Sequence, residues 1–264
     1  MTNYFEEDIY QTPEGLRSTG DKIFLNTRWY FVAKCFKFLL CKRRIALNGG
    51  FENDVWQKSS YEFIKLIESC GGKFSFSGLD NIRDLKEPVV YVSNHMSTLE
   101  TFVFPCIMLM AGDVSFVVKR SLTTNYIFGP IMRATDPVVV NRKNPKEDLQ
   151  QVLKKGKEYL QNGTSVVVFP QSTRSVKFDK SLFNSLGVKL AKSAGVKVVP
   201  VAIKTNFWEN GKILKELGPI KRDNTIHMKF GEPISIEKNG KAEQEAIVDF
   251  ICANLESFGG EVIR

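Results

Sequence analysis

Short runs of β-branched residues, separated by stretches of helical character, constrain the fold of this chain more than any other feature of its sequence. Near-continuous apolar strands that alternate with helices are typical of a parallel sheet covered on both faces. The sequence therefore predicts an α/β fold with a mainly parallel central sheet flanked by helices. The runs begin at Val89, Ser115, Pro137, Ser165, Val196 and Thr225.

The helix expected after Asn144 is the best defined of the segments between these runs. Asn144 is suited to cap its N-terminus, Pro145 suits its first position and Glu147 can complete a capping box. We expect the helix to end at Gly163. Its buried stripe is expected to comprise Leu149, Val152, Leu153 and Leu160.

The N-terminal part of the chain has a different pattern, which predicts two amphipathic helices ahead of the α/β part. The first is expected to end at Gly49 and Gly50, because paired glycines break a helix. The second is expected to run from about Asp54 to Cys70. The chain is accordingly divided into an N-terminal tail (residues 1–22), a two-helix motif (residues 23–70) and an α/β domain (residues 71–264).

The first of these two helices is basic. The stretch from Ile23 to Leu47 contains no acidic residue and six basic ones, which account for most of the net charge of +8. A projection at 100° per residue places apolar side chains on one face and most basic side chains opposite. The apolar face holds Trp29, Val32, Ala33, Phe36, Leu39 and Leu40, and the other side holds Phe31, Lys34, Lys37, Phe38, Lys42 and Arg44.

Two interpretations fit such a helix: it lies in a membrane interface, or its apolar face packs on the rest of the domain. A span of the bilayer is not expected, because Lys34 and Lys37 interrupt the apolar stretch and no run of about 18 uncharged apolar residues exists. The basic excess suits a polyanionic partner such as phospholipid headgroups, a phosphorylated substrate or nucleic acid. Nucleic acid is the weakest of these, since no groove-reading motif is present.

Other features exclude several function classes. The five scattered cysteines form no Cys-x-x-Cys pair and are expected to be free thiols in a reducing compartment. Neither a phosphate-binding Gly-Lys-Ser/Thr loop nor a dinucleotide-binding G-x-G-x-x-G occurs. The acidic first residues lack the apolar core of a secretory signal. No metal site is predicted, because the chain has one candidate histidine and no cysteine cluster.

The two histidines differ in their surroundings. His227 alternates with apolar neighbours in a strand-like run and is interpreted as structural, whereas His95 follows the run from Val89 at a strand-to-helix corner. Glu100 lies five residues after His95, so the two can meet only if His95 precedes the helix and points back over its first turns. A carboxylate on one imidazole nitrogen would fix the tautomer and leave the other nitrogen as a base.

Cationic side chains follow three of the predicted strands. Lys119 follows the run from Ser115, Arg142 follows the run from Pro137, and Arg174 lies in the polar loop after the run from Ser165. Strand ends are where binding sites form in α/β sheets, and arginine offers a bidentate fork to phosphate. The pattern therefore favours phosphate recognition. The polar loop reads Pro170, Gln171, Ser172, Thr173, Arg174 and Ser175.

These residues resemble the motifs of a known family. Asn94-His95-x-Ser97-x-x-Glu100 resembles the N-H-x-S-x-x-D signature of the lysophospholipid acyltransferases, the 1-acylglycerol-3-phosphate acyltransferase group. The segment from Phe169 to Ser175 resembles their F-P-E-G-T-R-S block. The stretch from Gly129 to Arg142 is similar to the second block, and Val199-Pro200-Val201 to the fourth. All four occur in the family's order within roughly residues 70–235.

The chain departs from the family pattern at three places. Glu100 stands in place of aspartate, and one extra methylene can still reach the imidazole. Gln171 and Ser172 replace the usual Glu-Gly, which bears on the identity of the acceptor. Tyr126 stands where a proline is common.

The resemblance implies transfer of a fatty acyl chain from acyl-CoA or acyl carrier protein to the free hydroxyl of a lysophospholipid, by default 1-acyl-sn-glycerol-3-phosphate. His95 would be the base and Glu100 would hold it. No cofactor is expected. The residues implied in substrate binding are Lys119, Arg142, Gln171, Ser172, Thr173 and Arg174.

The resemblance also favours membrane docking of the two-helix motif, because family members of this size carry such a motif. The chain would then lie at the cytoplasmic face of a membrane as a peripheral or monotopic protein, with a phospholipid surface as a partner and no nucleic acid. The residues expected to dock are Trp29, Phe31, Lys34, Lys37, Phe38 and Lys42.

Three alternatives stay open at this level: acyl transfer to a different lysolipid acceptor, a thioesterase, and a non-catalytic lipid-binding protein on the same fold. The presence of both His95 and Glu100 argues against the last. A serine hydrolase is disfavoured, because no G-x-S-x-G elbow exists, although a His–acid dyad can also activate water.

Overall fold

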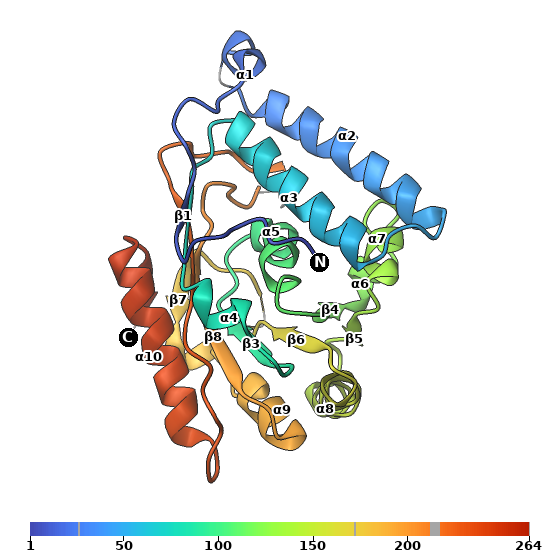
Figure 1. The fold of residues 1–264 in the computed structure, drawn as a ribbon, viewed down its shortest axis with the longest axis vertical. Helices are drawn as coiled ribbons and strands as arrows, with labels where there is room; N and C mark the ends of the chain where they lie inside the picture. Colours follow the sequence, from blue (N-terminus) through green and yellow to red (C-terminus); the bar gives the residue numbers. More distant parts are fainter. Residues whose placement is uncertain (26, 172, 212–216, 264) are drawn as a thin grey trace.

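The computed structural model describes residues 1–264 except residues 26, 172, 212–216 and 264. In this part of the chain, a sheet of eight strands runs through the centre of the molecule in the order β1-β2-β9-β8-β3-β6-β4-β5. Helices lie on both of its faces (Figure 1). Its strands are β1 (Tyr10–Gln11), β2 (Phe74–Ser77), β3 (Val90–Ser93), β4 (Val114–Lys119), β5 (Val138–Val140), β6 (Ser165–Val168), β8 (Val198–Lys204) and β9 (Ile226–Phe230).

The elements around the sheet are mostly helices. A second, small sheet pairs β7 (Lys177–Asp179) with β10 (Glu261–Ile263) in parallel. The helices are α1 (Thr19–Ile23), α2 (Arg28–Leu47), α3 (Asn53–Ser69), α4 (Asp80–Arg83), α5 (Leu99–Met108), α6 (Arg120–Thr123), α7 (Gly129–Ala134), α8 (Pro145–Gln161), the 3-10 helix η1 (Lys180–Leu182), α9 (Leu186–Ala194) and α10 (Lys241–Ser257).

The central sheet is mainly parallel, as the sequence predicts. Strand β3 pairs in parallel with β6 and β8, β4 with β5 and β6, and β2 with β9. The β8–β9 and β1–β2 pairs are antiparallel. Each of the six predicted β-branched runs overlaps one of the strands β3, β4, β5, β6, β8 and β9, although β4 begins one residue before its run and β8 ends one residue after.

Each face of the sheet has its own core. In β6, Val167 belongs to one core, and Val166 and Val168 belong to the other, which is the alternation of a strand covered on both faces. The first core contains residues of α2, α3 and α5, and the second contains residues of α8, α9 and α10. Figure 1 shows these two groups of helices on opposite sides of the strands.

Helix α8 begins as predicted. The Asn144 side chain accepts a hydrogen bond from the Lys146 amide at 3.1 Å. The Glu147 carboxylate accepts a hydrogen bond from the Asn144 side-chain amide at 2.7 Å. In a capping box this second bond would come from the Asn144 backbone amide. The buried side of the helix differs in part from the prediction: Val152, Gly156, Tyr159 and Leu160 are buried, whereas Leu149 and Leu153 are half-buried.

The N-terminal segments pack on the same core as the sheet. Within residues 1–22, predicted as a tail, Phe5 is buried and β1 extends the sheet by pairing Tyr10 with Phe76. Phe31 of α2 and Trp56 of α3 belong to the first core. The two-helix motif therefore shares its apolar interior with the α/β part.

Helix α2 turns most of its predicted apolar face outward, so the interpretation in which that face packs on the domain is wrong. It begins at Arg28, within the stretch that lacks acidic residues. The side chains of Trp29, Phe36 and Leu40 are 58%, 51% and 42% exposed, so most of the predicted apolar face points away from the domain. The opposite side of the helix packs inward. There the Phe31 ring lies edge-to-face against the Trp208 ring, with 5.2 Å between the ring centroids. None of the described helices is long and apolar enough to cross a bilayer.

This orientation corrects the predicted set of docking residues. Phe31 is wholly buried, and Phe38 packs against Phe63 with 5.3 Å between ring centroids. Lys42 is also buried, and its Nζ lies 2.6 Å from Glu62 Oε2. These three predicted residues face the protein. The predicted residues at the outer surface are Trp29, Lys34 and Lys37.

Candidate active site

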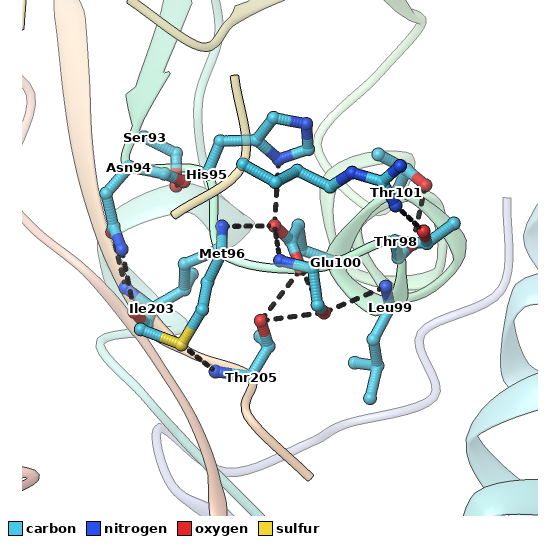
Figure 2. Close-up of polar contacts among 12 residues, drawn as sticks. Ser93, Asn94, His95, Met96, Thr98, Leu99, Glu100, Thr101, Ile203 and Thr205 are labelled. Carbon is cyan, nitrogen blue, oxygen red and sulfur yellow. Dashed lines mark hydrogen bonds and ion pairs between the residues drawn. The ribbon is translucent and has the colours of Figure 1, made fainter. Parts of the chain in front are cut away.

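His95 and Glu100 meet in the corner between β3 and α5. His95 follows the end of β3 at Ser93, and its ring points back over the first turn of α5 (Figure 2). Its Nδ1 lies 2.8 Å from Glu100 Oε1. The expectation that the histidine must precede the helix to reach the acid is therefore confirmed.

Asn94 fixes this corner to the neighbouring strand. Its side-chain amide donates to the Ile203 carbonyl at 2.8 Å, and its side-chain oxygen accepts from the Ile203 amide at 2.9 Å. The Asn94 side chain thus takes the place of backbone hydrogen bonds between β3 and β8, at the point where β3 has ended and β8 continues (Figure 2). A buried asparagine that makes both bonds holds its own backbone in one position, and His95 comes next in the chain.

Glu100 is fully buried but surrounded by donors. The backbone amides of Met96 and Ser97 donate to Oε1 at 2.8 and 2.9 Å. The hydroxyls of Ser97 and Thr205 each lie 2.8 Å from Oε2. These contacts satisfy a buried carboxylate, which would otherwise be strongly destabilising.

The protonation state of Glu100 follows from these contacts. Burial acts to raise the pKa of its carboxyl, but the hydrogen bond and charge of His95, with the amide of Ser97, lower the pKa below its ordinary value. An ionised carboxylate only accepts hydrogen bonds, so the proton between the pair belongs to Nδ1 of His95. The other ring nitrogen, Nε2, is then the basic atom.

The loop after β6 holds His95 from the other side. The Gln171 side-chain oxygen accepts a hydrogen bond from the His95 amide at 2.7 Å, and the Ser175 amide donates to the His95 carbonyl at 2.9 Å. The imidazole stacks on the Phe169 ring with 4.3 Å between centroids. Both faces of the corner are thus supported, which restricts the ring to one orientation.

A cavity of about 960 Å³ opens beside His95. Its wall combines polar residues, which the sequence places after three strands, with apolar residues. Such a combination suits a ligand with a charged head and a hydrocarbon portion. The predicted catalytic and substrate-binding residues in the wall are His95, Lys119, Arg142, Gln171, Thr173 and Arg174, and the apolar residues include Phe51, Trp56, Phe102, Phe116 and Ile131. Phe38 and Lys42, which are among the residues predicted to dock on a membrane, line the cavity as well. Ser172 lies outside the described residues.

Arg142 has an unusual backbone. Its φ of 55° lies in the left-handed region, which a non-glycine residue rarely adopts. Two hydrogen bonds hold it there: the amides of Asn141 and Arg142 donate to the Asp148 carboxylate at 2.8 and 2.7 Å. Asp148 stands in the first turn of α8, where a negative charge is favoured. In Arg174, by contrast, it is the side chain that is held, because its guanidinium donates a hydrogen bond to the Thr98 hydroxyl.

Several residues of this site are not among those predicted from the sequence. Thr205 directly follows β8, so the rule that pointed to the other strand ends applies to it as well. Asp148 and Lys189 also line the cavity. Both lie in helices that contain several charged residues, and nothing in the sequence distinguishes these two from the others. Among the residues that the structure describes, no three His, Cys, Asp or Glu side chains group as metal ligands.

His227 lies elsewhere, in β9. Its ring stacks on Phe258 with 4.5 Å between centroids, and burial, together with the charge of Lys204, lowers its pKa. It is absent from the described residues that line the cavity. Of the two histidines, His95 alone therefore faces the cavity.

Comparison with known proteins agrees with this geometry. Residues 73–204, half of the chain, match the family model described as Acyltransferase. The chain is 32% identical over 174 residues to the 1-acyl-sn-glycerol-3-phosphate acyltransferase of Pseudomonas aeruginosa, a match that covers 65% of this chain and 63% of that protein. It is 30% identical over 166 residues to the probable 1-acyl-sn-glycerol-3-phosphate acyltransferase of Mycoplasma genitalium, covering 58% and 60%. The chain thus spans somewhat less than two thirds of these relatives.

The fold also has a counterpart among solved structures. The crystal structure of the 1-acyl-sn-glycerophosphate (LPA) acyltransferase PlsC from Thermotoga maritima superposes with a TM-score of 0.65. The match covers 90% of this chain and 95% of that one at 18% identity, a level at which it shows the shared fold. The family model spans the His95–Glu100 corner, the three strand ends and the loop after β6. This chain belongs to the acyltransferase family.

Proposed function

We propose that this protein transfers a fatty acyl chain from an acyl-CoA or acyl carrier protein thioester to the free hydroxyl of a lysophospholipid. The observation that carries the proposal is that His95, paired with Glu100, lines a cavity whose wall combines cationic and apolar side chains. The acceptor we favour is 1-acyl-sn-glycerol-3-phosphate, which would give phosphatidic acid. The names of the relatives support this choice.

The chemistry follows from the geometry of the pair. His95 Nε2 takes the proton of the acceptor hydroxyl as its oxygen attacks the thioester carbonyl carbon. The carbon–sulfur bond then breaks, and the leaving thiolate takes the proton from the imidazolium. Glu100 stabilises the imidazolium through Nδ1 and keeps the ring in place. No covalent acyl-enzyme is needed.

The cations of the cavity wall suit the acceptor phosphate. Lys119, Arg142 and Arg174 come from three different strand ends and meet at one cavity. A doubly charged phosphate is recognised by such a cluster, and guanidinium groups bind it in bidentate fashion. The apolar wall is suited to a hydrocarbon chain.

We also propose that the protein works as a peripheral or monotopic protein at the cytoplasmic face of a membrane, where lysophospholipids reside. The exposed side chains of Trp29 and Phe36, with the exposed Lys34 and Lys37, support this. Apolar and basic side chains on one exposed helix are typical of interfacial binding.

The test is acyl transfer to lysophosphatidic acid from a thioester donor in detergent, with His95→Ala and His227→Ala as a matched pair. We expect the wild type and His227→Ala to form phosphatidic acid and His95→Ala to form none. Free fatty acid in place of phosphatidic acid would favour a thioesterase. If the wild type forms neither product with any lysolipid acceptor, the alternative of a non-catalytic lipid-binding protein gains support.

A further inference from the structure

Two segments that are far apart in the sequence share an unusual composition. Residues 23–51 contain no Asp or Glu and six basic residues, and residues 114–135 contain no Asp or Glu and three basic residues. They meet in space, because α2 packs against α7. Figure 1 shows the C-terminal half of α2 beside α6 and α7. The basic excess of the chain is thus gathered in one region of the fold.

A specific contact joins the loop between α6 and α7 to α2. Arg43 Nε donates to the Tyr126 carbonyl at 3.0 Å, and the Arg43 guanidinium lies 4.4 Å from the centroid of the Tyr126 ring. The Tyr126 side chain nevertheless remains 78% exposed, and Leu122 is 43% exposed. The loop is held against the helix while its large side chains point to the surroundings.

The two segments together present apolar side chains among positive charges. Trp29, Phe36, Leu40 and Leu47 are exposed on α2. Leu122 of α6 and Tyr126 of the loop after it are exposed as well. The absence of acidic residues from both segments complements an anionic surface and disfavours a second copy of the same positively charged face. An aromatic ring with a polar tip, such as that of Tyr126, suits the headgroup level of a bilayer.

Helix α6 and the loop after it are also part of the cavity wall. Ser121, Leu122 and Phe128 line the cavity, together with Ile131 and Met132 of α7. A surface that contacts lipid here would place the cavity next to the bilayer, so that an acceptor with a long acyl chain passes from lipid to protein with little exposure to water.

We propose that residues 121–128 form a second membrane-contact site beside α2, which seats the cavity on an anionic phospholipid bilayer. The inference rests on the membrane association included in the proposed function. It adds a contact from the α/β part to the one expected from the two-helix motif.

Vesicle binding tests the site. We would measure co-sedimentation with phosphatidylcholine vesicles that contain phosphatidylglycerol, for the wild type, the double variant Leu122→Ser/Tyr126→Ser and the control Ile263→Ser. Ile263 is 47% exposed and follows α10, whose core lies on the other face of the sheet. We expect the double variant to lower the partition coefficient roughly tenfold, equivalent to about 1.4 kcal/mol, and the control to leave it unchanged.

A positional probe makes the test independent of any effect on folding. An environment-sensitive fluorophore would be attached at Tyr126→Cys or Ile263→Cys in a Cys41→Ser background, since Cys41 is the exposed cysteine of the five and the other four are buried. We expect a blue shift and a rise in emission on addition of vesicles at position 126 and no change at position 263.

The outcomes separate this inference from the proposed function. A wild type that binds vesicles while position 126 stays silent, or while the double variant binds as well as the wild type, would overturn the second contact. A wild type that does not bind vesicles would overturn it too, together with the proposed membrane association. Acyl transfer is tested on its own in detergent.

Discussion

The imidazole Nδ1 of His95 lies 2.8 Å from Oε1 of Glu100, although residues five positions apart point about 140° away from each other on a regular helix. The contact exists because His95 stands before the helix and Glu100 within its first turn. The acid also accepts bonds from the amides of Met96 and Ser97, which lie between β3 and the helix. One side chain therefore holds both the backbone of this corner and the ring of His95.

Replacement of Glu100 by glutamine should impair catalysis more than stability at neutral pH. The amide keeps the volume but removes the charge that stabilises the imidazolium, so we expect kcat to fall by about 10²-fold to 10⁴-fold. The measurement is kcat with near-ultraviolet circular dichroism as a check of the fold. Glu68→Gln is a matched control, because Glu68 is also buried but bonds Tyr10 and Thr12. A Glu100→Gln enzyme with wild-type kcat would contradict the mechanism.

The lowered pKa of Glu100 predicts how stability depends on pH. The folded-state pKa lies below the ordinary value of 4.5, so ionised Glu100 stabilises the fold above about pH 4.5. This stabilisation is lost as the pH falls through the lower, folded-state value. Thermal unfolding between pH 7 and pH 3 should therefore show a smaller loss of Tm for Glu100→Gln than for the wild type. Parallel Tm curves would show that Glu100 is not the group responsible.

Removal of the Arg174 guanidinium should affect the acceptor alone. We expect Arg174→Ala to raise the KM for a phosphate-bearing acceptor about tenfold, the cost of a lost charge-assisted bond, and to leave the KM for the thioester donor unchanged. Lys177→Ala is the control, because Lys177 is exposed and pairs with Glu261. Equal KM values for the acceptor in wild type and variant would show that Arg174 does not bind phosphate.

Asp148 is expected to act through Arg142. Its carboxylate holds the amides of Asn141 and Arg142 and so maintains the left-handed backbone of Arg142. Asp148→Ala and Arg142→Ala should each raise the acceptor KM several-fold, and the double variant should add little to either. A double-mutant cycle measures this, with Glu147→Ala as the control in the same turn of α8. Additive effects would mean that the two residues act separately.

The sheet and the reacting corner could be predicted from the sequence because both depend on local pattern. The β-branched runs mark strands that are buried on both faces, and His95 and Arg174 lie in the segments that follow two of them. The same reasoning fails for β1, whose two residues carry no periodicity and form a strand because β2 is available to pair with them.

The orientation of α2 could not be predicted for a different reason. A helical projection ranks faces by average hydropathy, and it favours the side with Trp29, Phe36 and Leu40. The protein buries the other side, where Phe31 packs against Phe207 and Trp208. Lys42, on the same side, forms an ion pair with Glu62. The orientation of the helix therefore depends on contacts between segments that are distant in the sequence. For the same reason Asp148 could not be predicted as part of the site, because its role depends on its contacts with the amides of Asn141 and Arg142.

The two bonds between Asn94 and Ile203 give the reacting corner its own reporter. The Ile203 amide donates to a side chain of the corner at a point where the parallel pairing of β3 and β8 has ended. Exchange of this amide with deuterated solvent therefore requires the corner to open, whether or not the rest of β8 unfolds. The protection factor of one backbone proton thus measures the free energy that keeps His95 in position.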